Sequence, residues 1–176
     1  CKQCNCVVMG GETAEMPNIY MHKKQDFVGC MIGVVDKHKI IDGKKTIQVD
    51  DILIGLPSSG PHTNGYSLIR KIMNLDVPDI YTLKFLCQPH TSYLKPISHL
   101  KDKVDILGLC HITGGGLIDN PPRILPDNMS MTLFSTTWEI PKEFRYLQER
   151  ANLSDFEFYR TFNCGIGMLI VIKSDM

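Results

Sequence analysis

The stretch ILIGLPSSGPHTNGYSLIRKIM, residues 52–73, carries the clearest fold signal in the chain. Residues 52–56 are apolar over the length of a strand, and the Pro, Ser, Gly and Asn cluster that follows cannot continue it. From Asn64 onward, apolar side chains recur at spacings of three and four, which places them on one face of a helix. The stretch therefore predicts a strand, a polar loop containing glycine, and a helix.

The same order of elements returns downstream. Residues 104–113, VDILGLCHIT, predict a second strand that runs into three glycines, and residues 117–125 then look helical although two prolines interrupt them. Between these two units, residues 91–100 predict a helix in which Pro96 marks a kink or a new start. The repeated order favours an α/β fold for this part of the chain.

Further elements are predicted outside these two units. The alternation of MSMTLF, residues 129–134, predicts a strand, and the apolar runs at 27–35 and 166–172 predict two more. Pro141 opens a helix at its first turn, and Ser154 with Glu157 predicts a capping box for another. We expect an α/β (α+β) fold with a mixed sheet and packed helices, and a domain boundary between Ile41 and Asp51.

The composition excludes several classes of protein. With 43% hydrophobic and 22% charged residues the 176-residue chain is globular, and 19 basic residues balance 19 acidic ones, so no overall field favours nucleic acid or an anionic membrane. The apolar runs are too short to cross a bilayer of about 30 Å. We expect a cytoplasmic protein with no nucleic-acid or membrane partner.

The seven cysteines indicate reduced thiols, since they are odd in number and scattered. The opening CKQCNC lacks the second ligand pair that a structural zinc site needs. The chain begins on Cys1 and stops shortly after its last predicted strand, so we expect it to be part of a longer protein.

Three loops containing glycine are candidate binding sites: GGETAEMP at 10–17, SSGPHTNG at 58–65 and HITGGG at 111–116. Glycine lets backbone N–H groups approach an anion closely, and a following helix adds the positive end of its dipole, so the second and third loops are plausible phosphate cradles. Neither matches a Walker A loop or a dinucleotide fingerprint. Taken singly, each loop also fits an ordinary turn.

Several side chains in or near these loops could carry chemistry. Glu12 and Glu15 suit Mg²⁺ or a substrate amine, although surface acids and a helix cap account for them too. His62 and His111 could transfer a proton or bind phosphate, or could be structural hydrogen-bonding histidines. Cys164 lacks an identifiable partner histidine, so a packed thiol is favoured there. The remaining histidines, His90 among them, receive no role.

Four long strings, GGETAEMP, SSGPHTNGYSLIRK, HITGGGLIDNPPRILP and RTFNCGIGM, occur in an order that resembles the aminoimidazole ribonucleotide synthetase family. The resemblance runs from just before the family's domain junction through most of its second domain. The alternatives are related ATP-using families, namely formylglycinamidine ribonucleotide synthetase, thiamine phosphate kinase, selenophosphate synthetase and the hydrogenase maturation factor. A non-catalytic fragment is a further alternative. The first and third strings favour the cyclo-ligase.

The resemblance implies an enzyme that uses ATP and Mg²⁺ to close formylglycinamidine ribonucleotide into aminoimidazole ribonucleotide in purine biosynthesis. It implies a homodimer of two-domain subunits, in which residues 1–45 end the N-terminal, ATP-binding and dimerising domain and residues 46–176 belong to the C-terminal domain. The family's main ATP-binding segment has no counterpart here, so the chain alone is expected to be inactive.

The resemblance also assigns site residues. The catalytic candidates are His62 and His111, and Glu12 is a candidate Mg²⁺ ligand. The remaining positions bind cofactor (Gly11, Glu12, Thr13, Glu15) or substrate and its phosphate (Ser59, Gly60, Thr63, Asn64, Gly65, Thr113, Gly114, Gly115, Gly116). The chain departs from the family at Asn18, where glycine is usual, at Thr63, where serine is usual, and at Pro121.

Overall fold

The structure is a computed structural model that describes residues 1–21 and 23–174. The chain divides into two compact units, Cys1–Ile40 and Ile41–Met176. The sequence-based boundary after residue 45 remains a prediction.

The first unit has little regular structure. Its described residues contain two 3₁₀ turns, η1 (Lys2–Cys4) and η2 (Lys37–Lys39). The strand predicted over residues 27–35 is wrong: the segment pairs with no other described residues, and Val28 and Val34 are 92% and 99% exposed. A strand needs a neighbour to receive its backbone hydrogen bonds, and an apolar run cannot supply one by itself.

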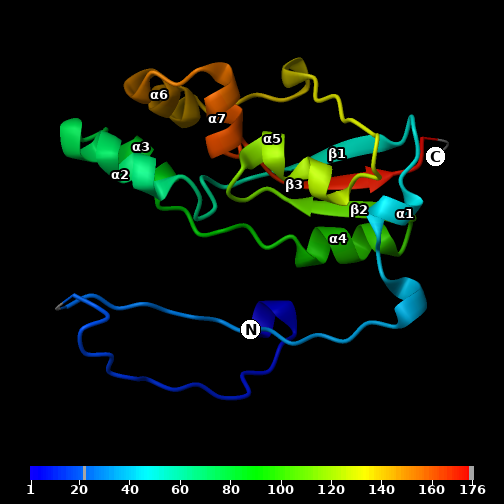
Figure 1. Cartoon of the computed structure of the whole chain (residues 1–176), viewed down its shortest axis with the longest axis horizontal. Coiled ribbons are helices and arrows are strands. Elements are labelled where there is room, and N and C mark those ends of the chain that lie inside the picture. Colours follow the sequence, from blue (N-terminus) through cyan, green and yellow to red (C-terminus); the bar gives the residue numbers. More distant parts are fainter. Residues whose placement is uncertain (22, 175–176) are drawn as a thin grey trace. The chain divides into compact units, whose positions relative to one another are not determined.

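The second unit combines short helices with a three-stranded sheet (Figure 1). In chain order its elements are α1 (Gly43–Thr46), β1 (Ile52–Pro57), α2 (Tyr66–Leu75), α3 (Ile80–Leu86), α4 (Leu94–Lys101), β2 (Ile106–His111), α5 (Gly116–Asp119), η3 (Pro121–Ile124), η4 (Ser135–Thr137), α6 (Lys142–Ala151), α7 (Asp155–Thr161) and β3 (Ile166–Ile172).

The sheet has the order β1-β3-β2, and β3 runs antiparallel to both neighbours. The α/β fold class is confirmed, but the sheet in the described residues is antiparallel throughout rather than mixed. The reason is that β3 inserts in reverse between two strands that are parallel to each other. Leu56 of β1 and His111 of β2 both pair with Met168. The carboxyl ends of β1 and β2 therefore lie at the same edge of the sheet.

The main core joins the helices to the sheet. Phe144 and Leu147 of α6, Phe158 of α7 and Ile69 of α2 are at most 1% exposed and pack in one cluster with Leu169 of β3. Within α6, Phe144 and Leu147 lie three residues apart and the residues between them are more exposed, as an amphipathic helix requires. Their burial packs α2, α6 and α7 against the sheet at β3.

Most local predictions are confirmed. The strands at 52–56, 104–113 and 166–172 appear as β1, β2 and β3, and the helix after Asn64 appears as α2. The capping box of α7 forms both of its bonds, from the Glu157 N–H to Ser154 Oγ at 3.3 Å and from the Ser154 N–H to Glu157 Oε2 at 3.1 Å. Pro96 lies in the first turn of α4, and Pro141 precedes α6 as its N-cap.

The strand predicted at residues 129–134 is wrong. Met131 and Leu133 pack against the core as the alternation implies, but no described strand runs beside them. Alternation reports which side chains are buried, not whether a ladder partner exists. No helix in the described residues combines the length and apolar character that a membrane span requires.

Candidate functional site

Two of the predicted loops meet at one edge of the sheet. The His62 loop (residues 58–65) leaves β1, and the triglycine loop (residues 111–116) leaves β2. The Ser58 N–H donates to the Gly165 carbonyl at 2.9 Å, and the Ile112 N–H donates to the Gly167 carbonyl at 3.0 Å. Both loops are thus bound to the start of β3, which confirms that the two loops lie at one sheet edge.

His62 is almost completely buried, at 1% exposure, within its loop. Its Nε2 atom accepts hydrogen bonds from the backbone N–H groups of Ser59 at 3.0 Å and Thr91 at 3.3 Å. Because a backbone amide can only donate, Nε2 carries no proton, and the neutral ring is protonated at Nδ1. Burial, followed by the nearby His90 and His111, lowers the pKa of His62 to about 4. His62 is therefore neutral at pH 7.

The side chain of Asn163 also holds the His62 loop in place through hydrogen bonds. Its Nδ2 donates to the Gly60 carbonyl at 2.8 Å, and its Oδ1 accepts from Ser58 Oγ and from the Gly165 N–H, both at 3.0 Å. The side chain is 1% exposed, so these bonds are shielded from water. Sequence reasoning missed Asn163 as a site residue; the only signal was its place in the string RTFNCGIGM.

The neighbouring Cys164 is the packed thiol that the sequence favours. It is fully buried and its Sγ lies 3.5 Å from the Phe162 carbonyl. Burial raises the pKa of this thiol far above its ordinary value. A group that stays protonated and inaccessible at neutral pH is a poor nucleophile.

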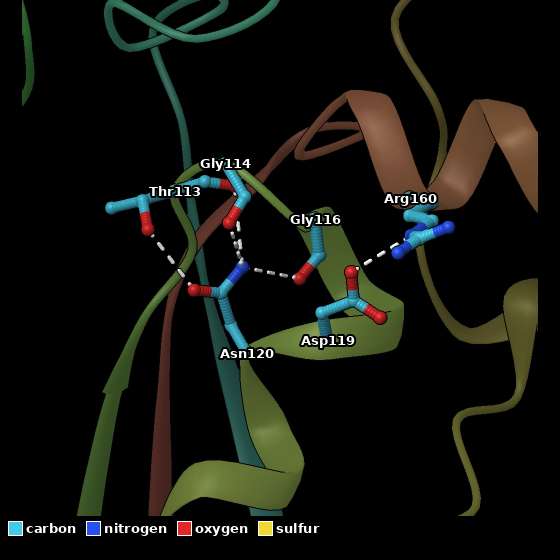
Figure 2. A network of polar contacts seen from close by, with 6 residues as sticks. All are labelled: Thr113, Gly114, Gly116, Asp119, Asn120 and Arg160. Atoms are coloured by element: carbon cyan, nitrogen blue, oxygen red, sulfur yellow. Dashed lines mark hydrogen bonds and ion pairs between the residues drawn. The ribbon is translucent and has the colours of Figure 1, made fainter.

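The triglycine loop is shaped by the buried side chain of Asn120 (Figure 2). Its Nδ2 donates to the carbonyls of Gly116 at 2.8 Å, Thr113 at 3.2 Å and Gly114 at 3.3 Å. Its Oδ1 accepts from Thr113 Oγ1 at 3.0 Å. One side chain thus binds three carbonyls of the loop. The N–H groups of Gly114 and Gly115 donate to no other described residue, so they remain available to a ligand.

Glycine is required in this loop at one position and optional at another. Gly116 has a φ of 55°, and a Cβ there would collide with the backbone carbonyl of Tyr159. Gly114 has open space, where an added Cβ would meet only Asn64 Oδ1 at 3.9 Å. That short separation also shows how closely the His62 loop approaches the triglycine loop.

A third segment, residues 87–93 between α3 and α4, completes the site and is called here the His90 segment. The His90 ring stacks on His62 with centroids 3.9 Å apart and planes inclined by 24°. Its Nε2 lies 2.9 Å from Nε2 of His111. The pKa of His111 is lowered mainly by burial and to a smaller extent by the charge of the nearby His90. Sequence reasoning assigned His90 no role because it lies in an ordinary polar stretch of sequence.

The Ser59 and Thr113 hydroxyls serve the loops themselves. Ser59 Oγ donates to the Pro89 carbonyl at 2.7 Å, and Thr113 Oγ1 donates to Asn120. Thr63 Oγ1 and Asn64 Nδ2 both donate to the His62 carbonyl. These side chains set the loop conformation, so ligand contacts from the loops would come mainly from the backbone.

The predicted cofactor residues, Gly11, Glu12, Thr13 and Glu15, lie in the first unit, and their roles stay predictions. In the described residues no three His, Cys, Asp or Glu side chains are arranged to hold a metal ion. A cavity of about 390 Å³ lies beside α5, lined by Leu117, Met131, Trp138 and Tyr159 among others, and contains none of the predicted site residues.

Comparison with known proteins identifies the family. Residues 48–175 match the family described as AIR synthase related protein, C-terminal domain. The chain is 44% identical over 183 residues to a phosphoribosylformylglycinamidine cyclo-ligase of Neisseria meningitidis serogroup B, and 43% identical over 181 residues to one of Methylobacillus flagellatus. The alignments cover 99% of this chain and 53% and 52% of those relatives, so the chain spans about half of their length. The chain therefore belongs to the AIR synthase family.

Proposed function

We propose that this chain forms part of an ATP-dependent cyclo-ligase that closes formylglycinamidine ribonucleotide into aminoimidazole ribonucleotide during purine biosynthesis. The observation that carries the proposal is the similarity, over 99% of the chain, to relatives named phosphoribosylformylglycinamidine cyclo-ligase. The two loops, the third segment and the residues that fasten them all fall within the aligned part.

The substrate's phosphate is proposed to bind between the His62 loop and the triglycine loop. The N–H groups of Gly114 and Gly115 are available to an anion, and α2 and α5 begin directly after the two loops. The formal net charge of the chain is zero, so oriented backbone groups would supply the attraction. Ser59, Gly60, Thr63, Asn64, Gly65, Thr113 and Gly116 contribute by fixing the shape of the two loops.

His111 is the better placed of the two histidines for proton transfer. Ring closure releases a proton as the attacking nitrogen bonds to the activated carbon, and a neutral imidazole can accept it. Burial lowers the pKa of His111, which favours the neutral form at pH 7. His62 has its Nε2 occupied by two backbone N–H groups, so it supports the loop and the ring of His90.

ATP and Mg²⁺ are proposed to bind to residues of the first unit. Carboxylate oxygens are the ligands that Mg²⁺ prefers, and Glu12 forms no ion pair with another described residue, so it fits that role. Gly11, Thr13 and Glu15 would line the nucleotide site with it. ATP supplies the phosphoryl group that activates the formyl oxygen. The parent enzyme is proposed to be a cytoplasmic homodimer.

The proposal is tested in the parent enzyme by measuring substrate-dependent ADP release. We expect His111→Ala and His62→Ala each to lower turnover by about 10²-fold or more, the usual size for loss of proton transfer or of site geometry. His99→Ala, on the exposed face of α4, is the matched control and should leave turnover unchanged. A folded His62→Ala/His111→Ala double variant with wild-type turnover would refute the assignment.

The 176-residue chain alone should release no ADP on addition of formylglycinamidine ribonucleotide. It spans about half the length of the relatives, and the ATP site is proposed to need residues beyond it. Substrate-dependent turnover by this chain would contradict that division of the active site.

A further inference from the structure

His90 connects the two site loops although the predicted chemistry does not use it. It stacks on the ring of His62, and its Nε2 lies 2.9 Å from Nε2 of His111. Its segment is tied to the His62 loop by the bond from Ser59 Oγ to the Pro89 carbonyl and by the Thr91 N–H to His62 Nε2. The ring is therefore held from one side and directed at His111 on the other.

The hydrogen bonds determine which nitrogen of each ring carries a proton. His90 Nδ1 lies 2.8 Å from the Thr91 carbonyl, which can only accept, so Nδ1 is the protonated nitrogen of a neutral His90. Its Nε2 is then an acceptor. A bond between two Nε2 atoms needs one proton, so the proton comes from His111. This leaves Nδ1 of His111 as that ring's unprotonated nitrogen.

The contact between His90 and His111 fits a hydrogen bond better than a metal site or simple packing. A metal ion bound by both Nε2 atoms would need further ligands, and the described residues offer no third His, Cys, Asp or Glu in position. If the His90 ring only filled space, it would not need the hydrogen bond from its Nδ1 to the Thr91 carbonyl that orients it. The titratable groups that face the pair are His62 and Tyr93, and burial raises the pKa of Tyr93 to about 12, so both are uncharged at neutral pH.

We propose that His90 is a positioning residue for His111: it accepts the proton of His111 Nε2 and so holds that ring between the two loops with Nδ1 free to accept a proton. The inference rests on the proposed function for the role of His111, but the hydrogen bond itself does not. His90 acts through His111 and needs no contact with the substrate. It serves as the second partner that usually fixes the tautomer of a working histidine.

The test is nitrogen NMR of the histidine rings in the 176-residue chain. We expect a through-hydrogen-bond coupling between Nε2 of His111 and Nε2 of His90 in the wild-type chain. His90→Phe keeps an aromatic ring against His62 but cannot accept the proton. The coupling should vanish in this variant. His99→Gln is the control and should leave the coupling unchanged.

Turnover of the parent enzyme gives the second readout. His90→Phe should lower kcat by about 10-fold with little change in KM, since only the orientation of His111 is lost. His90→Gln, whose amide oxygen can accept the same proton, should restore most of kcat. Absence of the coupling in the wild type would overturn the proposal. If the coupling is present but His111→Ala is fully active, the pair stands and the proposed function of His111 fails.

Discussion

Replacing Asn120 with alanine should destabilise the second unit markedly. The amide has two N–H donors and shares them among three carbonyls, so at most two full hydrogen bonds come from Nδ2 and one more is accepted by Oδ1. At about 1 kcal/mol net for each bond, the three contribute about 3 kcal/mol. The side chain is 1% exposed, so water cannot replace them fully.

Urea unfolding of the chain, monitored by circular dichroism, measures this loss. We expect Asn120→Ala to lower the free energy of unfolding by about 3 kcal/mol, equivalent to a fall of about 10 °C in Tm for a domain of this size. Asn74→Ala on the exposed face of α2 is the matched control and should change stability by less than about 0.5 kcal/mol. A loss below about 1 kcal/mol at Asn120 would show that this side chain does not hold the loop.

Two further predictions use other parts of the site. Gly116→Ala should prevent stable folding of the second unit or lower its free energy of unfolding by more than about 3 kcal/mol. Gly114→Ala, where an added Cβ has open space, should change that free energy by less than about 1 kcal/mol. Equal effects of the two substitutions in thermal melts would contradict this difference. His62 has a pKa of about 4 when folded against an ordinary value of 6.5, so protons bind the unfolded chain more readily. Its stabilising contribution is complete above pH 6.5 and is lost as the pH falls towards 4, with His111 acting in the same direction, and a His62→Gln variant should show a flatter pH dependence in urea unfolding.

The elements predicted correctly are those whose signal is local. β1, α2 and β3 follow from runs and spacings within a few residues, and the α7 capping box from two residues three apart. The shared edge of the two loops also followed from topology, since both predicted strands lead into a glycine loop and then a helix. The antiparallel β3 between them changes the sheet but leaves this edge intact.

What could not be predicted depends on contacts between distant residues. The runs at 27–35 and 129–134 have strand composition but pair with no strand in the part of the chain that the structure describes, and composition cannot reveal a missing partner. His90 and Asn163 matter because the fold brings them against loops that are distant in sequence. From the sequence His62 could be a reactive loop histidine or a structural one, and its burial and two backbone donors emerged only from the fold.

A phosphate titration of the ¹⁵N-labelled chain, followed through its backbone amide signals, tests whether the edge shared by β1 and β2 binds an anion. The amides of Gly114 and Gly115 should move together with those of the His62 loop along one saturating curve, because both loops would contact the same phosphate. Chloride at equal ionic strength is the control and should leave these signals in place. Unchanged signals in both loops, or shifts confined to lysine-rich surface segments, would contradict a phosphate site at this edge.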